Sequence, residues 1–330
     1  SPLVTSRVPL AHQRGDNLWP NWVGTQALAA NSASVGNELV YSSTRDNPLG
    51  DIYQQCVDVC RDGNLQPVAG VDAGPSRRTF GPAGVANTEP VALNDPSGLD
   101  DARVYLALTT TRFRPDGSLG WLVLPPADVA SVPAAQREVS SLYGDAPPQG
   151  AQPAFGDLCI GSENCAPSLA YTATGADPYG DVLLQQLTQD GGLIAIGAPV
   201  DVANTPGAAE SQPAIVTGNN SDGEHAGVYI TARSGSAGIS TAVAVDGAGR
   251  QPFLSADPDE SQPVYSPDGT RLAYSQLVPG DPQSESPDRR VIMIADADGT
   301  GTPRQLASQD ADGVEYDTEP AWSPDGTRIA

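Results

Sequence analysis

The stretch Glu260–Ser275, ESQPVYSPDGTRLAYS, and the stretch Asp317–Ala330, DTEPAWSPDGTRIA, are near copies of each other. Each copy reads as a short apolar strand, a turn and a second apolar strand. Pro-Asp-Gly makes the turn in both, because proline presets φ, aspartate can hydrogen-bond the local backbone and glycine accepts a positive φ. The two copies therefore predict a β-hairpin that recurs along the chain.

Weaker copies of the same pattern lie upstream. A polar residue, a proline and an apolar residue recur at each start, with Trp19-Pro20-Asn21-Trp22 as a divergent first copy. The starts fall near residues 20, 90, 153, 213, 263 and 320, which are 70, 63, 60, 50 and 57 residues apart. A second strand centred on tyrosine follows the first five starts, at Tyr41, Tyr105, Tyr171, Tyr229 and Tyr274.

Most copies continue into two further strands. Third strands are predicted at 51–54, 120–124, 181–184, 241–245 and 291–294. Fourth strands are predicted at 66–69, 193–196, 251–254 and 304–307, with a vague one around Glu138 and Val139. Four short antiparallel strands repeated at this interval are typical of β-propeller blades, which bury their sheet faces by stacking radially. The predicted fold class is therefore all-β, a propeller of four-stranded antiparallel blades.

The repeated phrase also resembles a known family. Pro-x-Trp/Tyr-Ser-Pro-Asp-Gly-Thr-Arg-Ile/Leu-Ala, with Ser43-Thr-Arg-Asp-Asn and Gly50-Asp-Ile-Tyr53, is similar to the TolB-like propeller repeat. The match is specific at 260–275 and 317–330, good at 39–53 and degenerate in repeats two to four. The resemblance implies a ring of six blades, as found in periplasmic translocation proteins, in gating domains of prolyl-oligopeptidase-like enzymes and in many surface proteins.

We therefore expect residues 1–330 to form one TolB-like propeller whose sixth blade is incomplete, and the chain to continue beyond residue 330. Residues 8–11 resemble a fourth strand. They either close the ring against the sixth copy or belong to a preceding blade.

The charge of the chain narrows the classes of partner. The formal net charge is −23, with 17 arginines and no lysine. Such acidity argues against nucleic acid, which needs a basic patch, and against anionic membrane surfaces. The sequence contains no run of about 18 apolar residues, so no transmembrane helix is predicted.

The four cysteines form two close pairs, Cys56 with Cys60 and Cys159 with Cys165. Their spacing and the distant His12 and His225 do not suit a zinc site. Two local disulfides in an oxidising compartment are the better interpretation, although other pairings stay open. The repeat alignment places both pairs on one face of the ring.

The usual catalytic patterns are not found in the sequence. The string nearest to a nucleophile elbow, Ser234–Gly238, lacks the first glycine and lies between strands. Asp296-Ala-Asp298-Gly299 lacks the later acidic ligands of a calcium loop and is interpreted as a hairpin turn. We predict no cofactor, with structural calcium as the open alternative.

Acidic residues gather in the segments that join one blade to the next. In a propeller these segments line one mouth of the central channel, where a negative field can attract a cation or a basic peptide. The candidate residues of this mouth are Asp257, Asp259, Glu260, Asp310, Asp312, Glu315, Asp317 and Glu319.

The sequence thus predicts a non-catalytic propeller that binds a protein or supports an assembly, in the extracellular space, the periplasm or the cell envelope. One alternative is the substrate-gating propeller of a prolyl-oligopeptidase-like serine hydrolase whose catalytic domain lies outside these residues. A carbohydrate-active propeller is a further alternative, but it needs catalytic acids and stacking aromatics that are scarce here.

Overall fold

The described part of the computed structural model is all-β in its regular structure, and it contains no helix. It comprises residues 16–25, 35–57, 59–61, 67–69, 74–93, 104–124, 138–145, 147–159, 165–173, 180–189, 193–203, 210–216, 229–234, 239–244, 260–280, 288–297, 301–306 and 317–330. Within these ranges the model has no helix long and apolar enough to cross a membrane.

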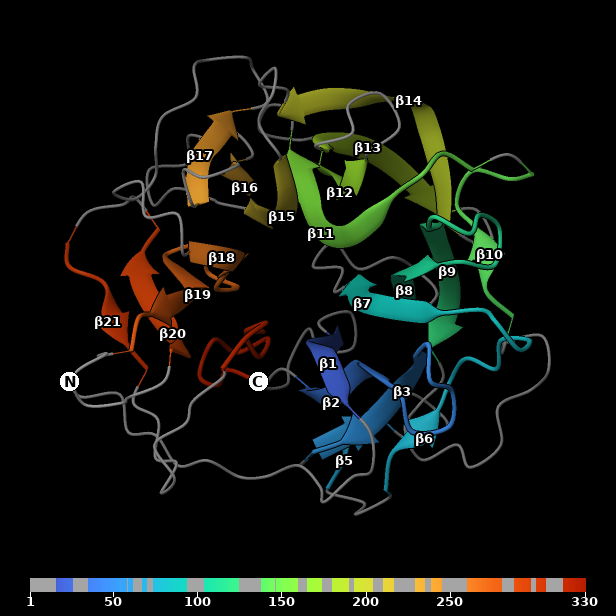
Figure 1. Ribbon diagram of the computed structural model, residues 1–330, viewed down its shortest axis with the longest axis horizontal. Helices are drawn as coiled ribbons and strands as arrows, with labels where there is room; N and C mark the ends of the chain where they lie inside the picture. The colour runs from blue at the N-terminus through green and yellow to red at the C-terminus, as the bar shows by residue number, and fades with distance from the viewer. Residues whose placement is uncertain are drawn as a thin grey trace.

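The strands form antiparallel sheets arranged as blades around a centre (Figure 1). Blade 1 is β1 (Asn17–Thr25), β2 (Val35–Ser43), β3 (Asp51–Cys56) and β6 (Ser76–Arg77), in that order. Blade 2 is β7 (Asn87–Leu93), β8 (Val104–Thr110), β9 (Ser118–Leu124) and β10 (Ser140–Ser141). Blade 3 is β11 (Ala151–Cys159), β12 (Cys165–Ala173), β13 (Asp181–Gln189) and β14 (Leu193–Ala203).

The chain continues around the ring in the same way. Blade 4 has three strands in the described residues, β15 (Glu210–Val216), β16 (Tyr229–Ser234) and β17 (Ile239–Ala244). Blade 5 is β18 (Glu260–Tyr265), β19 (Arg271–Val278), β20 (Arg289–Asp296) and β21 (Arg304–Gln305). The sixth copy, residues 317–330, forms a hairpin with one bridge from Trp322 to Ile329 and lies between blades 5 and 1 (Figure 1).

Propeller architecture and four-stranded antiparallel blades are therefore confirmed, with four complete blades in the described residues. Six complete blades are not seen there. The predicted strands at 251–254 and 8–11 lie outside the described residues.

The strand predicted at 66–69 exists as residues 67–69, but its assignment as the fourth strand of blade 1 was wrong. Residues 67–69 form β5, which pairs with β4 (Val59–Arg61) as a separate hairpin and not with β3. The fourth strand of blade 1 is β6, whose Arg77 lies opposite Tyr53 of β3. The apolar Pro-Val-Ala string favoured the wrong segment, because the true edge strand is polar and is held by side-chain contacts described below.

Apolar side chains fill the spaces between neighbouring blades. Val40 and Ile52 of blade 1 pack with Leu106 and Leu122 of blade 2 in one buried cluster. At the other end of the chain, Trp22 and Leu39 of blade 1 pack with Ala321 of the sixth copy. The last copy is thus joined to the first blade by a hydrophobic contact, which closes the ring.

The Ser-Pro-Asp-Gly-Thr-Arg turns have the predicted local structure. Ser266 and Thr270 donate hydroxyl hydrogen bonds to the Asp268 carboxylate, at 2.6 and 2.9 Å. The N–H of Arg271 donates to Ser266 Oγ at 2.9 Å, and Gly269 has a φ of 68°. Ser323, Asp325, Thr327 and Arg328 repeat the same side-chain contacts.

Candidate functional site

One residue at the start of every repeat has a left-handed backbone, and together these six surround the centre of the propeller. They are Trp19 (φ 51°), Glu89 (53°), Gln152 (53°), Gln212 (56°), Gln262 (57°) and Glu319 (58°). Each immediately precedes the proline of its repeat, and we call them the ring residues. A left-handed backbone costs a residue other than glycine on the order of 1–3 kcal/mol, so it persists only where the surroundings impose it.

Hydrogen bonds between neighbouring blades supply that constraint. In five of the six positions, the side-chain oxygen of a ring residue accepts the backbone N–H of the next ring residue around the propeller. The donor–acceptor pairs are Gln152 to Glu89 (2.7 Å), Gln212 to Gln152 (3.1 Å), Gln262 to Gln212 (2.9 Å), Glu319 to Gln262 (3.0 Å) and Trp19 to Glu319 (2.5 Å). The last bond links the sixth copy to blade 1.

Threonines of the second strands reinforce this ring in blades 2 and 3. The hydroxyl of Thr109 donates to the Glu89 carboxylate, and that of Thr172 donates to Gln152 Oε1 at 2.9 Å. Both hydroxyl oxygens also lie 3.2 Å from the next ring N–H.

The ring has one gap, at Trp19. Tryptophan has a donor but no hydrogen-bond acceptor in its side chain, so it cannot accept the N–H of Glu89. Glu89 lies in the register break between Thr88 and Val91 of the β7–β8 pairing. Within the described parts of the chain, no side chain accepts this N–H. Five of the six possible links are therefore made.

The two carboxylates of the ring are on either side of this gap. Burial raises the pKa of Glu89, although the hydrogen bonds from Thr109 and Gln152 act in the opposite direction. Burial also raises the pKa of Glu319, the Trp19 N–H lowers it, and the negative charge of Glu89 raises it again. The gap is thus bordered by two interacting carboxyl groups that favour protonation more than an exposed glutamate does.

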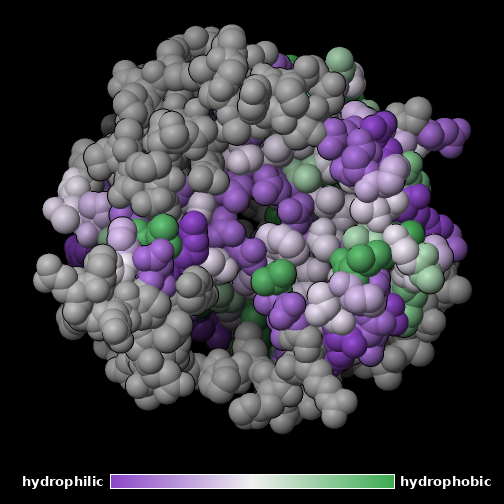
Figure 2. Space-filling view, in the orientation of Figure 1, coloured by the Kyte–Doolittle hydropathy of each residue, from purple (hydrophilic) through white to green (hydrophobic). Residues whose placement is uncertain are grey.

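Figure 2 shows a narrow opening at the centre of the molecule, bordered mostly by hydrophilic residues. The first strands β1, β7, β11, β15 and β18 surround this opening in Figure 1. The ring residues belong to these strands and to the sixth copy. The centre of the propeller is therefore polar, and five of its six ring residues each accept the backbone N–H of a neighbouring ring residue.

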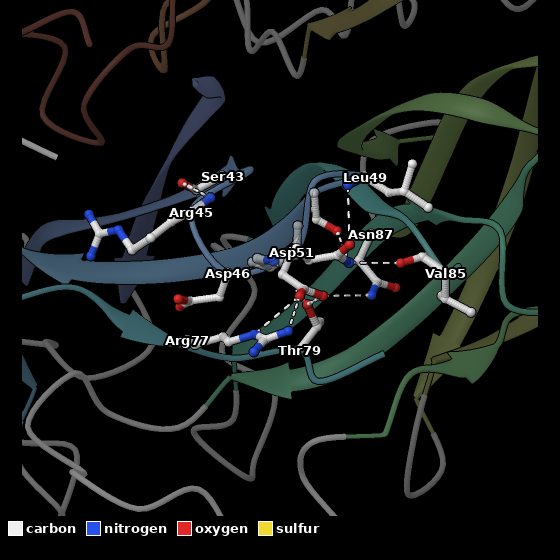
Figure 3. Close-up of polar contacts among 12 residues, drawn as sticks. Ser43, Arg45, Asp46, Leu49, Asp51, Arg77, Thr79, Val85 and Asn87 are labelled. Atoms are coloured by element: carbon white, nitrogen blue, oxygen red, sulfur yellow. Dashed lines mark hydrogen bonds and ion pairs between the residues drawn. The ribbon is translucent and has the colours of Figure 1, made fainter. Parts of the chain in front are cut away.

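Between blades 1 and 2, a buried carboxylate gathers partners from three segments (Figure 3). Asp51 is fully buried and accepts hydrogen bonds from Arg77 Nε (3.1 Å), Thr79 Oγ1 (2.9 Å) and Asn87 Nδ2 (3.1 Å). Asn87 begins blade 2, and its N–H donates to the carbonyl of Gly50 at 3.0 Å. Asp51 therefore holds both the edge strand β6 and the first strand of blade 2 against β3.

Between the last two copies, the repeat motif itself makes the contact. The guanidinium of Arg271 lies over the Trp322 ring at 4.5 Å and donates to the carbonyl of Gly326 at 3.0 Å. The indole N–H of Trp322 donates to the carbonyl of Val264 at 3.2 Å. Arg328 and Trp22 repeat the stacking between the sixth copy and blade 1, at 5.1 Å.

The structure describes three of the eight acidic residues predicted for the mouth. Glu260 is buried, at 4% exposure, and Glu319 is a ring residue. Asp317 is half-buried, and its N–H donates to the Arg290 carbonyl at 3.1 Å. Asp257, Asp259, Asp310, Asp312 and Glu315 lie outside the described residues, so the acidic mouth stays a prediction.

Cys56 ends β3 and takes part in a disulfide bond. Cys159 and Cys165 are directly opposite each other in the β11–β12 pairing, an arrangement whose Cα separation a disulfide can span. The specific pairs Cys56–Cys60 and Cys159–Cys165 stay predictions. In the described part of the chain we find no group of three or more His, Cys, Asp or Glu side chains that could hold a metal ion.

Sequence reasoning missed the ring, although its signal was present. The polar residue before each repeat proline served only to mark a strand start. A side chain with an acceptor at the same position in five of six copies is the pattern that could have predicted it.

Comparison with solved structures agrees with the architecture. TolB from Acinetobacter baumannii superposes with a TM-score of 0.56 at 15% identity, over 95% of this chain and 59% of that one. A protein assigned to TolB from Agrobacterium tumefaciens gives 0.53 at 14% identity, over 96% and 90%. The fold is a TolB-like β-propeller.

The TolB-like propeller also matches a protein of unknown function from Dyadobacter fermentans, with a TM-score of 0.51 at 16% identity, over 94% and 87% of the chains. No family model and no curated protein matches the sequence. Identities this low relate the TolB-like propeller to these structures by fold alone.

Proposed function

We propose that this TolB-like propeller is a non-catalytic binding module of a secreted or cell-envelope protein, and that it recognises a protein partner at the face where its first strands begin. The observation that carries the proposal is the ring. Its polar side chains accept backbone N–H groups of the neighbouring blades and so hold the blades together around the centre. The surface around the opening is therefore the main candidate for binding the protein partner.

The carboxylates at the centre support a structural role. A catalytic carboxyl group transfers a proton to a substrate group within hydrogen-bond reach, or attacks it. Glu89 instead accepts hydrogen bonds from Thr109 and Gln152, and Glu319 accepts the N–H of Trp19. These contacts join blade to blade, which is what a scaffold requires.

The charge of the chain suggests the kind of partner. At a net charge of −23 the protein repels nucleic acid and attracts basic protein surfaces over a distance of about 10 Å at moderate salt. The acidic segments predicted around one mouth would concentrate that field. A basic segment of another protein therefore suits this face best.

A matched pair of variants tests the proposal. In the first, Asp257, Asp259, Asp310 and Asp312 are changed to Asn. In the second, four exposed residues of the described chain are neutralised instead, namely Glu138, Asp145, Asp201 and Asp296. Both variants carry the same net charge, so a difference between them reports position and not total charge.

We expect cross-linking and affinity capture from envelope and culture fractions to recover one specific partner with the wild type and the second variant, and to lose it with the first. Equal capture by both variants would contradict the acidic mouth. Turnover of a peptide, ester or glycoside by the purified chain, abolished by one point substitution, would contradict the non-catalytic role. Alkylation should label no cysteine before reduction and all four afterwards.

A further inference from the structure

At the gap in the ring, a bound ligand could supply the hydrogen-bond acceptor that a ring side chain supplies at the other five positions. We propose that the position beside Trp19 binds a primary carboxamide, such as an asparagine or glutamine side chain on a partner segment entering the central opening. This inference rests on the proposed binding function and names the chemistry of the group bound. It uses only the six ring residues and their hydrogen bonds.

The unused donor defines the first requirement. In five positions the N–H of a ring residue points to the side-chain oxygen of the preceding one, at 2.5–3.1 Å. The ring residue that precedes Glu89 in this order is Trp19, which offers no acceptor. An N–H shielded from water and left without an acceptor is unfavourable, so an acceptor placed there is favoured.

The neighbouring carboxylate defines the second requirement. Glu319 accepts the Trp19 N–H through Oε2, and Gln262 Nε2 donates to its Oε1 at 3.4 Å. A carboxylate with four lone-pair sites can accept a further donor. A guest that offers one acceptor to Glu89 and a donor to Glu319 would therefore match both edges of the gap.

A primary carboxamide meets both requirements without adding charge, and it carries its donor and its acceptor on two separate atoms, whereas a hydroxyl must offer both from one oxygen. A guest carboxylate would bring a third negative charge beside Glu89 and Glu319, which already raise each other's energy. An ammonium or guanidinium group has donors but no acceptor for the Glu89 N–H. Gln152, Gln212 and Gln262 show that this ring holds carboxamides in that role.

Trp19 supplies the remaining contact. Its side chain is half-buried, and its indole offers an apolar face to the methylene groups of a guest. Trp19 also keeps its left-handed backbone with a φ of 51° although it passes on no ring hydrogen bond.

Hydrogen exchange of the backbone amides tests the gap first. In the wild type the Glu89 amide should exchange at least tenfold faster than the amides of Gln212 and Gln262, which have ring acceptors. Trp19→Gln places an acceptor at the sixth position and should slow Glu89 to the rate of the others. Equal protection of Glu89 in the wild type would overturn the inference.

Titration with small probes then tests the ligand. We expect N-acetyl-glutamine N-methylamide to shift the Glu89 amide resonance saturably, and the glutamate and norleucine analogues to bind at least tenfold more weakly. Trp19→Gln should abolish the shift, because its own carboxamide fills the gap. Trp19→Phe keeps an aromatic ring without an acceptor, and it should retain the shift. Failure of Trp19→Gln to fold would therefore leave the Phe variant and the probe series as the test.

The outcomes separate this inference from the proposed function. If the probes bind the wild type and Trp19→Gln equally, or do not bind at all, the carboxamide site is wrong. Capture of a partner through the acidic mouth would be unaffected by that result. Failure of the wild type to capture a specific partner, with intact probe binding, would instead contradict the proposed function and leave the site standing.

Discussion

The contact between blades 1 and 2 and the contact between blade 5 and the sixth copy join equivalent strands by different chemistry. Blade 5 and the sixth copy are linked by the ring bond from Glu319 to Gln262 and by Arg271 stacked on Trp322. Blades 1 and 2 lack the ring bond, because Trp19 cannot accept it. They are joined instead by the fully buried Asp51 and its three partners.

The difference shows which part of a blade contact the repeat encodes. Where the Ser-Pro-Asp-Gly-Thr-Arg phrase is intact, its arginine and the tryptophan of the next copy make the contact, so the motif carries its own interface. Where the first copy diverges, polar residues outside the phrase replace it. A buried polar network stabilises the fold when all its groups are hydrogen-bonded and destabilises it when one partner is removed. It is therefore sensitive to single substitutions.

The largest expected effect is at Asp51. Asp51→Ala leaves Arg77 and Asn87 without their buried acceptor, and removal of one partner from such a network costs about 3–5 kcal/mol. We expect a large fall in the urea midpoint of unfolding. Asp268→Ala, in the turn near the sixth copy, should cost only about 1 kcal/mol, because Asp268 bonds locally at an exposed turn. Equal losses would show that the buried Asp51 network contributes no more than a local turn bond.

The fold was predictable because the strongest signals are local. Pro-Asp-Gly turns and alternating apolar strands are encoded within 14–16 residues, as in 260–275 and 317–330. The Asp268 turn was correctly derived in this way. The fourth strand of blade 1 was not, because Ser76 and Arg77 have no apolar pattern and depend on Asp51, which lies 26 residues away from Arg77 in the chain.

The second prediction concerns the ring bond itself. Gln262→Met keeps the length of the side chain but removes the acceptor of the Glu319 N–H, which should cost about 1–3 kcal/mol. Gln262→Glu keeps the acceptor but loses the Nε2 donor to Glu319 and adds a negative charge beside it, so it should recover only part of this loss. Denaturant unfolding of the three proteins measures the order. A Met variant as stable as the wild type would mean that the ring bond contributes nothing.

The third prediction concerns the stacked arginine. Arg271→Met removes the contact with Trp322 and the hydrogen bond to the Gly326 carbonyl, with an expected cost of about 1 kcal/mol. The control is Arg304→Met, at an exposed position of β21, which should change stability by less than about 0.5 kcal/mol. Melting temperatures compare the two variants. Losses of the same size in both variants would mean that the lost positive charge, and not the contact with Trp322, causes the loss of stability.

The candidate site was less predictable than the fold for a physical reason. The ring depends on contacts between residues 50–63 positions apart, and on Trp19 and Glu319, which are 300 apart. The sequence shows the polar residue before each proline. It does not show that the side chain of this residue bonds to the equivalent residue of the next copy. The effect of burial on Glu89 is likewise a property of the closed ring.

The smallest effect, and the one of opposite sign, is expected at Glu89 beside the gap. Burial raises the pKa of this carboxyl group above its unfolded value, so the protonated form is the one that the fold favours. Its contribution to stability is full below the unfolded pKa and is lost as the pH rises through the folded pKa. Glu89→Gln keeps an acceptor and cannot ionise. We therefore expect the variant to match the wild type near pH 4 and to melt about 2 °C higher at pH 7.

Asp325→Asn supplies the contrasting pH profile. Burial opposes ionisation of Asp325, but the hydrogen bonds from Ser323 and Thr327 outweigh it and lower its pKa. Its contribution is present above the unfolded pKa and is lost as the pH falls through the folded pKa, so Asp325→Asn should be destabilising at pH 7 and less so at low pH. Melting curves across this range give both profiles. A Glu89→Gln variant that is less stable than the wild type at pH 7 would mean that the charge of Glu89 strengthens its bond to Gln152 more than burial opposes it.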